Sequence, residues 1–281
     1  MTNEPTHYER YFDINMKYTL GANNFQKSVN RTRLTVLIAT RFSIVSPVII
    51  RWLYQVSQHQ SLVHLNKLVS AGLLTMVHTH RSPDNRVYVP TRAGIHYAEE
   101  LMSINVHYRS QSNPSLLVNQ NHIMHNLINA YILLRGVHNS NRDGKPAQLW
   151  SAFVTEPEFQ RLHTKSSTRA VDGVVLLADG TTAAIEVENS FKTKAVRETV
   201  LLKYLASLQA GHYQKIFMFS QSQRIFDDIQ RLHNQLFGEL PSKFNKRKQQ
   251  PQLTIDDVEL LRESIIYRTK FCHDITALFY S

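Results

Sequence analysis

The first third of the chain has apolar residues at spacings of three and four, which is the pattern of amphipathic helices. Leu34, Leu37 and Ile38 define the apolar face of the first helix, which we expect to begin near residue 30. Ser46 followed by Pro47 is typical of the cap and first turn of a second helix. A third helix is expected from about residue 61 to residue 72, and a fourth from residue 91 to about 102.

Two short β-branched runs, at 74–79 and 86–89, separate the third and fourth helices and are joined by the turn sequence RSPDN. Three helices followed by a basic hairpin resemble a winged helix-turn-helix domain of bacterial transcription factors over residues 30–105. The resemblance implies that the third helix enters the major groove of double-stranded DNA and that the hairpin touches the backbone or minor groove. The residues implied are Ser61, His64, Asn66 and Lys67 on the helix, and Arg81 and Arg86 on the hairpin. The alternative is a module that binds protein.

The rest of the chain alternates between helical and strand patterns. We expect a helix at 121–135, strands at 148–154, 171–177 and 182–188, a helix at 193–210, a strand at 215–220 and a helix at 224–237. The predicted organisation is an N-terminal arm (1–29), the DNA-binding domain (30–112), a second domain (113–240), and a basic linker with a C-terminal helix (241–281). The fold class is α+β or α/β.

The chemistry concentrates on the hairpin between residues 169 and 194. Asp172 opens one strand and Glu186 and Glu188 close the other, so strand alternation predicts three neighbouring carboxylates. Such a group is stable when a divalent cation neutralises it, and an all-oxygen site suits Mg²⁺ or Mn²⁺. Lys192 then stands close enough to act on a phosphate or a water molecule. The alternative is a solvated strand end, although a buried strand ending in Glu-Val-Glu places charge where it is costly.

These residues resemble the PD-(D/E)XK nuclease pattern, with Asp172 as the first acid and Glu186 as the second. The family's lysine normally stands at the position of Glu188, so either Lys192 or Lys194 replaces it, and we favour Lys192. The predicted order of elements is also that of the αβββαβ restriction-endonuclease-like core. His125, on the preceding helix, is a weaker candidate for the same site.

The composition of the chain limits the kinds of molecule that it is expected to bind. The 281 residues carry a formal net charge of +10, which favours a polyanion. There is no signal peptide and no apolar run of membrane-spanning length, so we expect a cytoplasmic protein that does not bind membranes. The resemblance to bacterial transcription-factor domains implies a bacterial source. The single cysteine, Cys272, excludes internal disulfides and a cysteine-based zinc site.

Taken together, the two domains resemble the replication-relaxation family, and within it the MobC-type relaxases of mobilisable plasmids. The resemblance implies a metal-dependent endonuclease that nicks one strand at a plasmid origin of transfer, with a helper mobilisation protein and a coupling protein as further partners. A relaxase with a tyrosine nucleophile and three metal-bound histidines is disfavoured, because the closely spaced pair His78 and His80 lies in the predicted wing. The remaining alternative is a non-catalytic replication or copy-control regulator that retains the nuclease fold.

Overall fold

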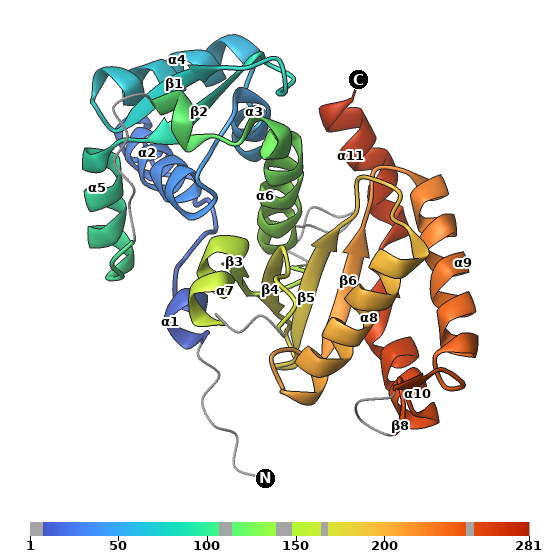
Figure 1. The fold of residues 1–281 in the computed structure, drawn as a ribbon. Helices are drawn as coiled ribbons and strands as arrows, with labels where there is room; N and C mark the ends of the chain where they lie inside the picture. The colour runs from blue at the N-terminus through green and yellow to red at the C-terminus, as the bar shows by residue number, and fades with distance from the viewer. Residues whose placement is uncertain (1–7, 107–113, 139–147, 164–167, 246–249, 281) are drawn as a thin grey trace.

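The computed structural model describes residues 8–106, 114–138, 148–163, 168–245 and 250–280. The protein belongs to the mixed α+β class, with an N-terminal half built mainly of helices and a second half built around a sheet (Figure 1). Among the described residues no helix has both the length and the apolar character needed to cross a membrane.

The N-terminal half follows the expected order of elements, with one additional short helix before them. Its members are α1 (Glu9–Phe12), α2 (Asn24–Arg41), α3 (Pro47–Tyr54), α4 (Gln58–Ser70), β1 (Leu74–His78), β2 (Arg86–Pro90) and α5 (Arg92–Met102). Strands β1 and β2 form an antiparallel hairpin.

Two helices of this half begin earlier than the apolar spacing predicts, because polar caps set their first residues. The Asn23 side chain accepts a hydrogen bond from the backbone N–H of Gln26 at 2.8 Å and starts α2. Ser57 and Gln60 form a reciprocal capping box that starts α4. Helix α4 therefore begins at Gln58, a turn before the position expected from its leucines.

The second half contains more elements than expected. They are η1 (Pro114–Leu117), η2 (Gln120–His122), α6 (Ile123–His138), β3 (Ala152–Thr155), α7 (Glu156–Leu162), β4 (Gly173–Leu176), β5 (Thr182–Val187), α8 (Lys194–Gln209), β6 (Lys215–Phe219), α9 (Gln223–Glu239), β7 (Phe244–Asn245), β8 (Gln250–Pro251), α10 (Ile255–Ser264), β9 (Ile265–Tyr267), η3 (Thr269–Phe271) and α11 (Cys272–Phe279). The predicted helices and strands are all present. The additions are the 3-10 helices η1, η2 and η3, helix α7, strands β7, β8 and β9, and a second C-terminal helix.

The main sheet has the strand order β3-β4-β5-β6-β9. Strands β3, β4 and β5 are antiparallel neighbours, whereas β6 is parallel to β5 and β9 is parallel to β6. Helix α8 covers one face of the sheet, and α6 and α11 lie on the other (Figure 1). Every residue of β5 is buried, so the carboxylates at its end enter an apolar environment.

The two halves pack against each other. Arg41, at the end of α2, donates to both carboxylate oxygens of Glu158 on α7 at 2.8 Å, and both side chains are buried. The N-terminal segment, which we expected to be a lead-in arm, also packs on the second half. The buried Tyr8 hydroxyl donates to the backbone carbonyl of His212 at 2.9 Å. The predicted domain boundary at 112 lies outside the described residues.

Candidate metal centre and nucleic-acid interface

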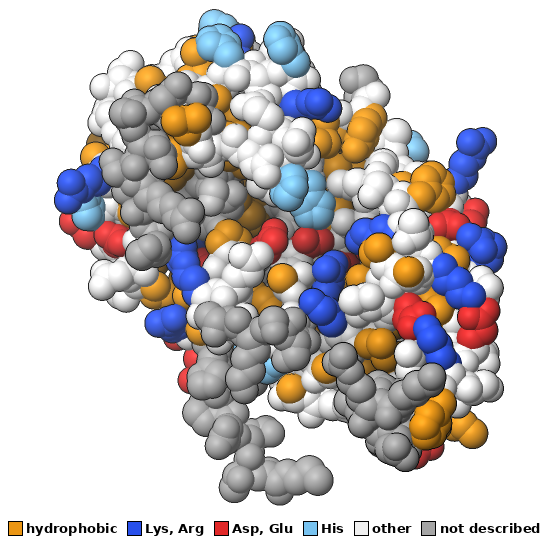
Figure 2. Space-filling model, in the orientation of Figure 1, with side chains coloured by type: hydrophobic (Ala, Val, Ile, Leu, Met, Phe, Trp, Pro, Cys, Tyr) orange, Lys and Arg blue, Asp and Glu red, His pale blue; other side chains and the backbone are white. Residues whose placement is uncertain are grey.

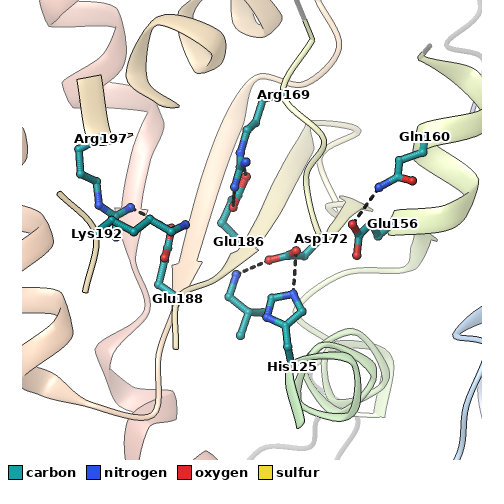
Figure 3. Close-up of polar contacts among 10 residues, drawn as sticks. His125, Glu156, Gln160, Arg169, Asp172, Glu186, Glu188, Lys192 and Arg197 are labelled. Carbon is teal, nitrogen blue, oxygen red and sulfur yellow. Dashed lines mark hydrogen bonds and ion pairs between the residues drawn. The ribbon is translucent and has the colours of Figure 1, made fainter. Parts of the chain in front are cut away.

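Asp172 occupies the junction of helix α6 with strands β4 and β5. Its Oδ1 lies 3.0 Å from Nε2 of His125, and its Oδ2 accepts a hydrogen bond from the backbone N–H of Val187 at 2.6 Å (Figure 3). The side-chain amide of Asn129, one turn after His125 on α6, donates to the backbone carbonyl of Asp172 at 2.6 Å. The position and orientation of this carboxylate are therefore held by one helix and one strand.

Glu186, in β5, is 1% exposed and is paired with a single base. Its two carboxylate oxygens accept hydrogen bonds from Nε and Nη2 of Arg169, both at 2.8 Å. Burial raises the pKa of Glu186 to about 7, the charge of Arg169 opposes that rise, and the charge of Asp172 adds to it. Glu186 is therefore a carboxylate whose charge depends on Arg169.

Glu188 follows the end of β5 and turns toward α8. Its Oε1 accepts hydrogen bonds from Nζ of Lys192 and from Nη1 of Arg197, each at 2.8 Å (Figure 3). Lys194 pairs instead with Glu239 of α9 at 2.5 Å. Of the two candidate lysines, Lys192 is therefore the one that stands beside a carboxylate of the hairpin.

The structure does not bring Asp172, Glu186 and Glu188 to one common cation position. Glu188 lies beyond the last residue of β5, so strand alternation no longer directs its side chain to the face shared with Glu186. The charges of Glu186 and Glu188 are already balanced by guanidinium groups at hydrogen-bond distance. Mg²⁺ or Mn²⁺ does not fit the expected three-carboxylate site in this arrangement.

A different group of ligand atoms does come together around Asp172. Within the described part of the chain, His125, Glu156 and Asp172 each offer one donor atom, and these atoms all lie within 4.8 Å of one another. Glu156 is the first residue of α7, and its Oε1 accepts a hydrogen bond from Gln160 at 2.9 Å (Figure 3). An imidazole nitrogen and two carboxylates are a donor set that fits a divalent transition metal.

The charges of this group are coupled. Burial lowers the pKa of His125, but the hydrogen bond and charge of Asp172, with smaller contributions from Glu156 and Glu186, more than offset it and raise that pKa to about 8. Burial also raises the pKa of Glu156, and the charge of Asp172 adds to the effect. Figure 2 shows acidic side chains gathered near the middle of this face, with histidine on one side and Lys or Arg on the other.

Glu156 was not among the site residues predicted from the sequence, although the local sequence indicates that a helix begins there. Thr155 and Glu158 form a capping box, and Pro157 lies in the first turn, a combination that marks the start of a helix at Glu156. Read in this way, the sequence places an acid directly after β3, at the edge of the sheet that carries Asp172.

Two of the six predicted DNA contacts face the interior. Ser61 is fully buried, and its hydroxyl donates to the backbone carbonyl of Gln58 at 2.7 Å. Nε2 of His64 is hydrogen-bonded to the Thr35 hydroxyl at 2.9 Å, and burial lowers the pKa of His64 to about 4. The prediction was wrong for Ser61 and His64 because α4 turns both residues toward the core. The exposed residues of α4 are Gln58, His59, Gln60, Val63, Asn66, Lys67 and Ser70.

The other four predicted contacts have at least part of their side chains at the surface. Asn66, Lys67 and Arg81 are exposed. Arg86 is half-buried, and its Nε donates to the backbone carbonyl of Asp84 at 3.3 Å. These side chains are available to a partner that lies along α4 and the β1–β2 hairpin.

Comparison of the chain with protein-family models, with curated proteins and with solved structures finds no match. The residues of the site therefore provide the basis for assigning a function.

Proposed function

We propose that this protein is a metal-dependent DNA endonuclease that binds double-stranded DNA through its N-terminal half and nicks one strand at a site centred on Asp172. The observation that carries the proposal is the group formed by the buried Asp172 with the partly exposed His125 and Glu156, in a chain whose net charge is +10. A strongly basic protein that concentrates carboxylates beside a histidine has a position for a cation within a surface that attracts polyanions.

Two further observations support this function. The elements α6, β3, β4, β5, α8 and β6 follow one another in the αβββαβ order, with Asp172 before β4 and Glu186 in β5. Elements α2 to α4, the β1–β2 hairpin and α5 follow the order of a winged helix-turn-helix. Both agree with the resemblance to MobC-type relaxases, so we propose a plasmid origin of transfer as the substrate, with Mg²⁺ or Mn²⁺ as the cofactor and a helper mobilisation protein and a coupling protein as partners.

In this proposal the residues have separate roles. Asn66, Lys67, Arg81 and Arg86 contact the duplex, with the cations on phosphates and Asn66 on a base edge. Asp172 holds the cation, which when bound polarises the scissile phosphate and activates a water molecule. Lys192, whose side chain is 27% exposed, remains accessible to a phosphate oxygen while it pairs with Glu188.

The test is the conversion of supercoiled plasmid carrying an origin of transfer to open circles by purified full-length protein with Mg²⁺ or Mn²⁺. We expect nicking by the parent and none by Asp172→Asn. Asp179→Asn is the matched control, because Asp179 lies in the exposed turn between β4 and β5. Plasmid that stays supercoiled with the parent and either metal, while the protein binds it, contradicts the proposal.

A second candidate function follows from one specific observation. Glu186 and Glu188 are paired with Arg169 and Arg197, as expected for buried acids with a structural role. This arrangement favours a non-catalytic DNA-binding regulator of replication or copy number that keeps the nuclease-like core as a scaffold. Such a protein shifts plasmid DNA in a gel and protects a defined segment, yet produces no open circles with any divalent metal.

A further inference from the structure

We propose that His125, Glu156 and Asp172 form a mixed nitrogen and oxygen site for a first-row transition metal, in preference to Mg²⁺. The inference deepens the proposed endonuclease function, on which its role in catalysis rests, but the binding itself does not depend on that function. It replaces the all-carboxylate set expected from the hairpin with a set drawn from three separate elements.

The geometry supports a single ion shared by these three side chains. The donors come from the third residue of α6, the first residue of α7 and the residue before β4, and they lie within 4.8 Å of one another. The remaining oxygen of Asp172 is held by the N–H of Val187, so the oxygen that faces His125 keeps a defined direction. Metal–nitrogen and metal–oxygen bonds of about 2.0–2.2 Å place the donors of one ion within about 4.4 Å of one another, which is close to the observed spacing.

A second observation comes from the residue that orients Asp172. Asn129 is 4% exposed, and while its amide nitrogen donates to Asp172, its amide oxygen has no hydrogen-bond partner in the described part of the chain. A buried acceptor of this kind is costly unless a donor satisfies it. A water molecule bound to an ion beside Asp172 is a suitable donor, since metal-bound water is a strong hydrogen-bond donor.

The donor set determines which metal is preferred. Mg²⁺ favours oxygen ligands and near-ideal octahedral geometry, whereas imidazole suits the later first-row metals. By the usual order of affinities, Zn²⁺ should bind more tightly than Mn²⁺. The surrounding basic groups Arg169 and Lys192 are engaged by Glu186 and Glu188, so their charges are largely balanced and do not repel the ion from Asp172.

The experiment uses Mn²⁺ as the probe on the full-length protein. Continuous-wave electron paramagnetic resonance measures the bound fraction, and electron spin-echo modulation reports whether a ¹⁴N nucleus is coupled to the bound ion. We expect one Mn²⁺ per chain with nitrogen coupling, displaced by Zn²⁺ at much lower concentration than by Mg²⁺. His125→Gln should abolish the nitrogen coupling, and Glu156→Gln should weaken binding at least about tenfold, by analogy with the loss of groups that support a metal site.

His122→Gln is the matched control, because His122 is an exposed histidine three residues before His125. It should leave affinity and coupling unchanged. Bound Mn²⁺ without nitrogen coupling in the parent, or a Glu156→Gln variant with parental affinity, overturns the proposed ligand set, and so does displacement by Mg²⁺ and Zn²⁺ at equal concentrations. The measurement on the parent decides the matter even where a variant does not fold.

The outcomes separate this inference from the endonuclease proposal. A protein that binds Mn²⁺ through nitrogen but leaves plasmid supercoiled supports the metal site and contradicts nuclease activity. A protein that nicks plasmid with Mg²⁺ and shows no nitrogen-coupled Mn²⁺ supports the nuclease and contradicts the ligand set. An absence of any stoichiometric ion means that His125 and Asp172 form only an ion pair.

Discussion

At the scale of single residues, the base that faces each acid determines what that acid can do. Glu186 is bidentate to Arg169, an arrangement that combines charge with the planar geometry of the guanidinium group. Asp172 faces a histidine and a backbone N–H, and so retains an oxygen that can be shared with an ion. Glu186 is therefore an acid held by an arginine, whereas Asp172 keeps an oxygen that is suited to binding a cation.

Removal of Arg169 should expose the cost of the buried charge on Glu186. With the guanidinium gone, the pKa of Glu186 rises further above the 4.5 of an ordinary glutamate. Below pH 4.5 Glu186 is protonated in both the folded and the unfolded variant, so its burial costs no charge. As the pH rises from 4.5 through the raised pKa of Glu186, the variant loses free energy of unfolding. We expect Arg169→Met to lose about 3–5 kcal/mol in urea unfolding at pH 8 and clearly less at pH 6.

The double variant Arg169→Met with Glu186→Gln is the matched comparison, because a neutral amide at position 186 does not titrate. The loss of unfolding free energy in the double variant, measured against the parent, should be nearly the same at pH 6 and at pH 8. An equal loss at both pH values in the single variant would mean that packing of Arg169, and not the charge of Glu186, is what matters.

His64 gives a second pH dependence, with the opposite sign. Burial lowers its pKa from 6.5 to about 4, so the folded protein holds a neutral imidazole that the unfolded chain protonates. Its contribution to stability is present above pH 6.5 and is lost as pH falls toward 4, by about 2–3 kcal/mol. His64→Gln, compared with the parent by urea unfolding at pH 7 and pH 4.5, should show a smaller acid-induced loss. Identical losses in both proteins would contradict the buried neutral state.

The sequence predicted some of these residues and could not predict others. A buried apolar strand that ends Glu-Val-Glu marks Glu186 and Glu188 as candidate site residues. The contact of Lys192 with Glu188 could be predicted because the two residues are only four apart in the sequence. Arg169 is seventeen residues from Glu186, and Glu156 is sixteen from Asp172, so their contacts depend on the path of the chain between strands. A period of two specifies the face of a residue within a strand, and it fails for Glu188 because β5 has already ended.

At the scale of elements, strong periodicity was enough to predict the longer helices and strands from the sequence, whereas short elements were missed. The three-residue strand β9 is too short for any alternation to be recognised, and it forms because β6 offers it a parallel partner. Helix α7 has only seven residues and is defined by its cap more than by an apolar face. Both elements depend on tertiary contacts that the local sequence does not specify.

Helix α7 links the N-terminal half to the proposed metal site, which leads to a prediction for Arg41. Its partner Glu158 also accepts a hydrogen bond from the backbone N–H of Thr155 at 2.8 Å, and so holds the turn that presents Glu156. Arg41→Met leaves Glu158 buried without its cation and should cost about 3–5 kcal/mol of stability. The same change should weaken Mn²⁺ binding although Arg41 is not a ligand.

The control for this effect is Arg51→Met, because Arg51 pairs with Asp84 within the N-terminal half at the longer distance of 3.4 Å. It should leave Mn²⁺ affinity unchanged. Parental Mn²⁺ affinity in a folded Arg41→Met protein, measured by the same resonance titration, would show that α7 keeps its position without the ion pair.

At the scale of the whole molecule, the two halves form one hydrophobic core rather than two separate ones. Tyr8 and Arg41 are buried against the second half and so join the N-terminal half to the half that carries the acidic site. Helix α4 lies on the side of the N-terminal half that faces away from the sheet (Figure 1). In the proposed function, a duplex bound along α4 must therefore extend beyond the N-terminal half to reach the site at Asp172.

This separation leads to the last prediction, which concerns the energetics of DNA binding. If the exposed face of α4 and the β1–β2 hairpin contact phosphates, each cation that neutralises one contributes a slope of about −0.9 to the dependence of log affinity on log salt. Lys67→Ala should therefore weaken binding to specific and random duplexes alike and reduce the magnitude of the slope by about 0.9.

Lys270→Ala is the control, since Lys270 is an exposed lysine of η3 in the second half, and the slope of this variant should equal that of the parent. Fluorescence anisotropy with a labelled duplex between 50 and about 200 mM salt measures both slopes, a range over which multi-phosphate contacts change affinity by orders of magnitude. A slope that falls equally in both variants would place the duplex across the whole basic surface instead of along α4.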